Sequence, residues 1–172
     1  MFINVAIAVV TYENRYLLVR RRSGNFPNLW GLVGGKLEDG EHIDNAIARE
    51  LKEETELEVT FDKLIGISTE MVTDKDKTMS TVLFCCSVNL INYQKQGNLD
   101  KSWFSENEKL ELKWFTKEEL LANPHIIGSD LLFLKHFYFD KDTNYMRIDC
   151  QRDNNGMVLC QDFGLHKYEK FN

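Results

Sequence analysis

The sequence predicts an α/β fold, in which helices pack against a β-sheet. Apolar residues alternate or run together in several short segments, as in strands, whereas 41–55 and 130–139 have the spacing of amphipathic helices. The chain has 172 residues, enough for one domain with a substantial core. The order of these segments agrees with a sheet covered by helices but does not by itself select one arrangement.

The N-terminal half consists mainly of predicted strands. Ile3, Val5 and Ile7 lie on one side of the first segment, and a turn at 13–15 leads to its returning partner. The segment 78–90 is rich in β-branched and aromatic residues and is expected in the centre of the sheet. The expected strands are 2–10, 16–20, 59–68 and 78–90, with a loop at 23–29 and a loop or hairpin tip at 70–77.

The C-terminal half begins with a long polar loop, 92–107, in which Trp103 and Phe104 either cap a ligand or anchor the loop. Ser129 is the expected N-cap of the second long helix. Asp153-Asn154-Asn155-Gly156 predicts a hairpin turn. The other expected elements are a strand at 108–115, a short helix at 116–121 and hairpin strands at 145–151 and 157–163.

Charge and composition restrict the partners of the chain. The net charge of −6 argues against a nucleic-acid polymer, whose phosphates call for a basic surface. It does not argue against nucleotides, because a bound metal ion can reverse the local charge. No apolar run is long enough to span a bilayer, and the N-terminus lacks the pattern of a signal peptide. A cytoplasmic protein without a membrane partner is therefore expected.

The four cysteines form no recognisable metal-binding motif. There is no C-x-x-C, and the four histidines are distant in sequence from one another and from the cysteines, so zinc is not expected. Reduced thiols are the default for a cytoplasmic protein. One cross-strand disulfide between Cys150 and Cys160 could form if the strand register allowed it.

The densest chemical signal is a group of acids in the first helix. With Glu50 at zero on a wheel of about 100° per residue, Glu53 lies at about −60° and Glu54 at about +40°. The apolar Ala46 and Ile47 fall at about −40° and +60° on the same wheel. The three carboxylates are therefore expected to point toward the body of the protein.

Buried carboxylates at this spacing repel one another and lose hydration, so a positive charge should compensate them. Mg²⁺ or Mn²⁺, which prefer carboxylate oxygens and keep sites for water and phosphate, would do so, and so would a neighbouring arginine. The alternative from the residues alone is a surface helix whose acids form ordinary salt bridges.

These acids belong to a longer pattern with fixed spacing, made up of Gly35, Glu41, Arg49, Glu50, Leu51, Glu53, Glu54 and Leu57. This pattern resembles the signature of Nudix hydrolases, G-x5-E-x7-R-E-U-x-E-E-x-G-U, where U is a bulky aliphatic residue. The preceding Trp30 to Lys36 is also similar to the family's lead-in, with Val33 where proline is common. Glu56 replaces the last glycine, so it either adopts a left-handed conformation at a cost of roughly 1–2 kcal/mol or the turn differs locally.

The resemblance implies a Nudix-type α/β/α sandwich, with a mixed β-sheet between the signature helix and the C-terminal helix. It assigns 1–140 to the Nudix hydrolase domain. Residues 141–172 lie beyond the usual core and contain no chemical motif. We expect them to form a C-terminal β-hairpin extension packed on the same domain, as an extra edge hairpin or as a homodimer contact.

The resemblance also implies a reaction, the hydrolysis of a diphosphate linkage by water at bound Mg²⁺ or Mn²⁺. Glu50 is either a metal ligand or the general base, and Arg49 orients one of the glutamates. Glu41 supports the junction between loop and helix. The implied metal ligands are the Gly35 carbonyl, Glu50, Glu53, Glu54 and Glu108, with Glu106 as the alternative to Glu108, and the implied catalytic residues are Glu50, Glu53 and Arg49.

Substrate contacts are expected beside these acids. Arginine matches phosphate oxygens well, so the triplet Arg20-Arg21-Arg22 at the end of the second strand is a candidate phosphate contact, against the alternative of a solvated strand end. Arg20 and Arg22 are the members chosen. Lys36, in the lead-in, is a third candidate. Phe26 and Trp30 either stack on a base or fill the core.

The expected substrate is a small-molecule nucleotide. A (deoxy)nucleoside triphosphate or an oxidised nucleotide, cleaved to monophosphate and pyrophosphate, is the first choice within the family's range. One alternative is an ADP-ribose or nucleotide-sugar pyrophosphatase. Another is a catalytically silent Nudix module that binds nucleotide, toward which only Glu56 points.

Overall fold

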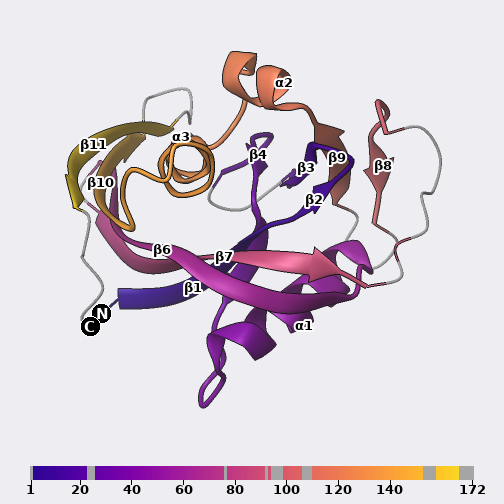
Figure 1. The fold of residues 1–172 in the computed structure, drawn as a ribbon. Coiled ribbons are helices and arrows are strands. Elements are labelled where there is room, and N and C mark those ends of the chain that lie inside the picture. The colour runs from indigo at the N-terminus through magenta and orange to yellow at the C-terminus, as the bar shows by residue number, and fades with distance from the viewer. Residues whose placement is uncertain are drawn as a thin grey trace.

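The structure is a computed structural model that describes residues 2–22, 26–75, 77–91, 93, 99–105, 110–152 and 158–166. Two sheets form the body of the described chain (Figure 1). The larger runs in the order β11 (Val158–His166), β10 (Tyr145–Arg152), β6 (Val59–Asp74), β7 (Lys77–Leu90), β1 (Phe2–Val9) and β5 (Val33–Lys36). Because β1 is parallel to β7 and β10 is parallel to β6, whereas the other neighbours are antiparallel, this sheet is mixed.

The smaller sheet runs in the order β2 (Thr11–Tyr12), β3 (Arg15–Arg20), β9 (Glu111–Phe115) and β8 (Trp103–Phe104), and β4 (Trp30–Gly31) pairs with β3. The short helix α2 (Lys117–Ala122) follows β9 and begins with a capping box between Thr116 and Glu119. Arg21, which follows the end of β3, reaches the Gly34 carbonyl on β5 of the larger sheet.

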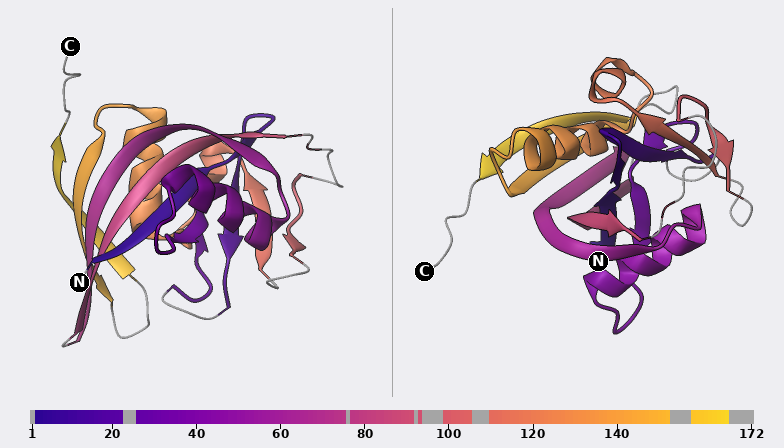
Figure 2. Two further views of the ribbon diagram at one scale, coloured as in Figure 1. Left: turned by 90° about the horizontal axis from the view of Figure 1, so that it is seen from below. Right: turned by 45° about the vertical axis from the view of Figure 1, so that its right-hand side comes forward.

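Helices cover opposite faces of the larger sheet, as Figures 1 and 2 show. Along β1, Ala6 and Ala8 pack in the core beneath α1 (Ile43–Thr55), whereas Ile7 packs in a separate core beneath α3 (Gly128–Phe133). The π-helix η1 (Leu134–Phe139) continues α3. The predicted sandwich with a mixed sheet is therefore confirmed.

Two sequence predictions need correction. The charged segment 70–77 was expected to be a loop or a hairpin tip. The hairpin tip is present, because Asp74 at the end of β6 pairs with Lys77 at the start of β7, but residues 70–74 belong to β6 and Glu70 is buried. Ser129 is not the N-cap of the second helix. It is buried inside α3, which begins after Ile127, whose N–H donates to the Trp30 carbonyl.

The C-terminal hairpin is confirmed and extends the larger sheet, because β10 pairs with β6. Cys150 stands opposite Cys160 in the register of β10 and β11, and Cys150 is disulfide-bonded. The predicted turn at 153–156 lies outside the described residues. No helix in the described part of the chain has the length and apolar character needed to cross a membrane.

Candidate active site

Two glycines bring the backbone of β5 against the acids of α1. At Gly34, φ is +147°, and a Cβ there would collide with the backbone of Ala6 on β1. A Cβ at Gly35 would collide with the carboxylate of Glu50. Only residues without side chains fit here, so main-chain atoms and the Glu50 carboxylate line one site.

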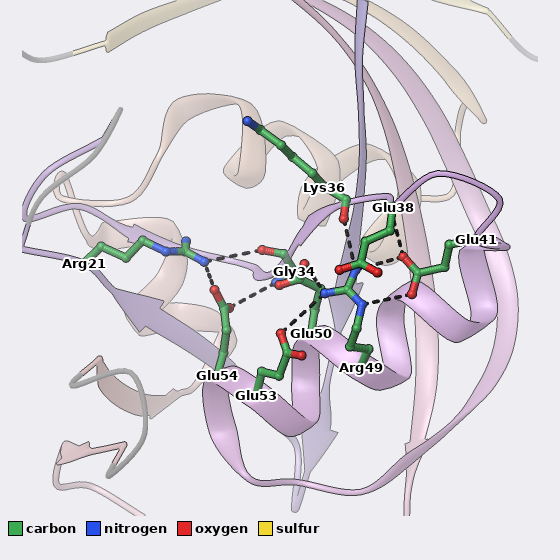
Figure 3. Close-up of polar contacts among 9 residues, drawn as sticks. All are labelled: Arg21, Gly34, Lys36, Glu38, Glu41, Arg49, Glu50, Glu53 and Glu54. Carbon is green, nitrogen blue, oxygen red and sulfur yellow. Dashed lines mark hydrogen bonds and ion pairs between the residues drawn. The ribbon is translucent and has the colours of Figure 1, made fainter.

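Arg49 binds three glutamates (Figure 3). Its Nε and Nη2 donate to the two carboxylate oxygens of Glu41 at 2.9 and 2.8 Å, and Nη1 donates to Glu50 at 2.8 Å and Glu53 at 3.4 Å. Nη2 also donates to the Lys36 carbonyl at 3.1 Å. The hydrogen bonds from Arg49 lower the pKa of Glu41 to about 2. Arg49 thus joins the loop before α1 to the acids along it.

Arg21 binds the deepest of the acids, Glu54. Glu54 is buried, and its Oε2 accepts a bond from the Gly34 N–H at 3.4 Å, while Nη2 of Arg21 lies 3.4 Å from the Gly34 carbonyl. Burial raises the pKa of Glu54, and the positive charge of Arg21 opposes that rise. Arg21 therefore compensates a carboxylate that water does not reach freely.

The three predicted acids of α1 differ in burial. Glu54 and Glu50 turn inward, but the side chain of Glu53 is 55% exposed. Leu51, at about +100° on the wheel, is also buried, so the buried face is centred near +40° and Glu53 lies about 100° from that centre. The expectation of three inward carboxylates holds for two, with Glu53 at the edge.

The donors around this site suit a hard divalent cation. Carboxylate oxygens of Glu50, Glu53 and Glu54 and the Gly35 carbonyl are the ligand types that Mg²⁺ and Mn²⁺ prefer. Because Gly35 has no side chain, its backbone can lie close to the carboxylate of Glu50, one of these ligand candidates. In this structure the carboxylates bind arginines and do not converge on one point. Glu106 and Glu108 lie outside the described residues.

One other group of possible ligands is close together in the described chain. His136, Asp140 and Asp142 place one ligand atom each within 4.8 Å of one another at the end of η1. Nδ1 of His136 is 3.1 Å from both carboxylate oxygens of Asp142, which is the geometry of an ordinary His–Asp pair.

The proposed substrate contacts Arg20 and Arg22 lie on the side of β8 and β9. Arg20 donates from Nε to Glu111 at 2.9 Å and stacks over the buried ring of Trp30 at 4.8 Å. Arg22 is exposed, with its guanidinium 5.5 Å from the ring centre of Phe104. Arg20 is thus engaged in the fold, and Arg22 remains available to a ligand.

The sequence analysis considered all three arginines of 20–22 and chose Arg20 and Arg22, whereas the structure places Arg21 among the acids. Successive strand residues point to opposite faces, so the alternation along 20–22 was the signal that separates Arg21 from its neighbours. Phe26 is half-buried against the core beneath α3. The side chain of Lys36 extends away from the carboxylates in Figure 3.

A second pair of acids lies beneath α3, and the sequence analysis did not identify it. Asp130 accepts a hydrogen bond from the Leu32 N–H at 2.7 Å, and burial raises its pKa to about 7. Burial also raises the pKa of Glu70, which a hydrogen bond with Ser129 opposes. The alternation of Ser68, Glu70 and Val72 onto one face of β6 was the available signal.

Comparisons with known proteins agree with this geometry. The family model described as NUDIX domain matches residues 2–136. An ADP-ribose pyrophosphatase of Methanocaldococcus jannaschii is 30% identical over 91 residues, 51% of this chain and 54% of the relative. Nudix hydrolase 2 of Arabidopsis thaliana is 22% identical over 156 residues, 90% of this chain and 49% of the relative. The chain thus spans about half the length of these two relatives.

A solved structure shares the fold. The crystal structure of a MutT protein from Bacillus halodurans superimposes with a TM-score of 0.62 at 22% identity, over 94% of this chain and 97% of the other. At that identity the likeness establishes the fold alone.

Proposed function

This chain belongs to the NUDIX domain family, and from that premise we propose that it is a metal-dependent hydrolase of nucleoside diphosphates linked to a further group. The first-choice substrate is a (deoxy)nucleoside triphosphate or an oxidised nucleotide, cleaved to monophosphate and pyrophosphate. The observation that carries the proposal is the set of α1 carboxylates packed against the glycine backbone of β5 and balanced by two arginines.

Glu50, Glu53, Glu54 and the Gly35 carbonyl would hold Mg²⁺ or Mn²⁺. When bound, the ion would neutralise phosphate charge and make a bound water more acidic. Arg49 fixes the orientation of Glu50 and Glu53 through its hydrogen bonds. The Gly34 N–H fixes one oxygen of Glu54.

The proposed reaction involves no covalent bond between the protein and the substrate. The oxygen of water forms a bond to phosphorus, the bridging P–O bond breaks, and the departing phosphate keeps the electron pair. Glu50 serves either as a ligand or as the base that takes the proton of the attacking water. Arg22, exposed beside Phe104, supports the proposal as a contact for the polyphosphate.

A second candidate is hydrolysis of ADP-ribose or a nucleotide sugar. It is favoured by the similarity of this chain to an ADP-ribose pyrophosphatase of Methanocaldococcus jannaschii. A module that binds nucleotides without cleaving them is a third candidate, motivated by Glu56 at the family's glycine position.

Chromatography of the products tests these candidates. The protein is incubated with Mg²⁺ and a panel of deoxynucleoside triphosphates, 8-oxo-dGTP, ADP-ribose and nucleotide sugars, beside Glu54→Gln. The matched control is Glu58→Gln, because Glu58 is exposed and pairs only with Lys52 among the described contacts. Wild type and control should release monophosphate from one compound, and Glu54→Gln should be slower by about 100-fold or more, since each tenfold is about 1.4 kcal/mol of barrier.

Absence of product from every compound, with Mg²⁺ and with Mn²⁺, would contradict the hydrolase. Nucleotide binding of equal strength with and without metal would then favour the silent module. Product from ADP-ribose alone would select the second candidate.

A further inference from the structure

Arg21 and Arg49 both neutralise acids of α1, but they are held differently. Arg49 makes bonds to three carboxylates and a carbonyl, and its side chain is 23% exposed. Arg21 follows the end of β3, its side chain is 38% exposed, and its described contacts are with Glu54 and the Gly34 carbonyl. Arg49 is built into the site, whereas Arg21 reaches into it from the rim.

The Arg21 contact conflicts with metal binding. Its guanidinium occupies one carboxylate oxygen of Glu54, and the Gly34 N–H occupies the other. A cation that takes an oxygen of Glu54 would meet the positive charge of Arg21 at once. Glu54 and Arg21 therefore cannot both keep their present arrangement and complete the proposed metal site.

We propose that Arg21 is a substrate-positioning residue that holds the place of the metal: it neutralises Glu54 in the metal-free protein, is displaced by the divalent ion, and then binds the phosphates of the substrate. This inference rests on the proposed function. Arginine suits both states, because its planar fork of donors matches a carboxylate and a phosphate equally well. The Arg21 side chain is 38% exposed, which leaves it room to turn from one to the other.

The exchange balances the charges of the site. Without metal, a buried carboxylate would remain uncompensated if Arg21 left, which is costly. With metal, a second cation at Glu54 is superfluous, whereas the incoming polyphosphate adds negative charge beside it. Metal and substrate thus each favour the same movement of Arg21.

The test measures Mn²⁺ binding by electron paramagnetic resonance, without substrate, in wild type, Arg21→Met and Glu54→Gln. Arg147→Met, which makes the same change in net charge on the exposed face of β10, is the control. Arg21→Met should bind Mn²⁺ about tenfold more tightly than wild type, because the competing cation is gone. The same variant should bind inorganic pyrophosphate with Mg²⁺ about tenfold more weakly, and Arg147→Met should match wild type in both assays.

These opposite changes separate the inference from simple damage, which would weaken both ligands. Unchanged or weaker Mn²⁺ binding by Arg21→Met, with wild-type binding lost in Glu54→Gln, would overturn the inference and leave the proposed function standing. Unchanged pyrophosphate binding would overturn the transfer to substrate. Absence of Mn²⁺ binding in wild type and Arg21→Met alike would overturn the proposed function itself.

A second measurement follows the Arg21 side chain directly in the wild-type protein. In ¹⁵N-arginine spectra of the wild type, the side-chain N–H signal of Arg21, identified by its absence in Arg21→Lys, should shift during a Mg²⁺ titration. The shift should be missing in Glu54→Gln. A signal of Arg21 that stays fixed while the backbone N–H of Gly34 responds to Mg²⁺ would contradict the displacement.

Discussion

Two groups of buried acids in this protein lie in different electrostatic surroundings. Around α1 the buried carboxylates bind arginines, as Glu54 binds Arg21. Beneath α3, Glu70 and Asp130 are 4% and 6% exposed, and within the described part of the chain neither forms an ion pair. Their partners are neutral groups, among them the Leu32 N–H on Asp130.

The difference shows how the same residue type serves two purposes. An arginine opposes the rise in pKa that burial causes, as Arg21 does for Glu54, and an ionised carboxylate can bind a metal. A neutral donor supplies a hydrogen bond without charge, so a buried acid beneath α3 keeps its proton until a higher pH. Arg21 acts on both groups, since its charge opposes the rise that burial causes in the pKa of Glu54 and of Asp130.

Asp130→Asn tests the acids beneath α3, whose partners are neutral groups, and has the largest expected effect on stability. The folded pKa of Asp130, about 7, exceeds its ordinary value of 3.8, so the native state binds more protons between those values. The free energy of unfolding of the wild type should fall as pH rises from about 4 to 7, by at most about 4 kcal/mol. The variant keeps an oxygen for the Leu32 N–H and should lose this slope.

Urea unfolding at pH 5 and pH 8 would measure how the free energy of unfolding changes with pH in the wild type and in Asp130→Asn. At pH 8 Asp130→Asn should be more stable than the wild type. If the variant keeps the full decline between the two pH values, another group, with Glu70 as the first to examine, carries the ionisation.

Glu41 tests the acids that pair with arginine. Its contribution to the free energy of unfolding should change with pH in the direction opposite to that of Asp130. Its pKa is lowered to about 2, chiefly by the hydrogen bonds from Arg49. Its stabilising contribution is therefore present above about pH 4.5 and is lost as pH falls toward 2. A ¹³C-carboxyl titration should find Glu41 still ionised at pH 3, and Arg49→Gln should move its midpoint back toward 4.5.

A Glu41 midpoint near 4.5 in the wild type would show that the Arg49 contact does not persist in solution. The contrast between the two acid groups would then reduce to burial alone.

Local signals made part of the structure predictable. The helix α1 was predictable from its periodic apolar residues, and the strand β1 from its alternating ones, because these patterns involve only residues close together in sequence. At Glu56 the sequence left two alternatives open, a left-handed residue or a locally different turn. The structure shows the first, because φ of Glu56 is +63° and its N–H donates to the Lys52 carbonyl.

Distant contacts made the rest unpredictable. Glu70 was assigned to a loop or hairpin tip because the segment 70–77 is charged, whereas its hydrogen-bond partner Ser129 comes from α3, much later in the chain. The burial of Glu54 was predictable from the helix, but its pairing with Arg21 requires the path of β3 past β5. Such pairings depend on how the two sheets and the helices pack together, and a local sequence pattern does not specify that packing.

Glu56→Gly has the smallest expected effect and isolates the helix end from the acids before it. Glycine has no Cβ penalty at positive φ, so the variant should be more stable by about 1 kcal/mol, with unchanged turnover. Glu56→Ala is the control, because alanine keeps the penalty and should show no gain. Thermal unfolding measures the first expectation and product release the second. A large change in turnover would mean that the conformation of residue 56 positions Glu53 and Glu54, and that the arginines alone do not fix the catalytic acids.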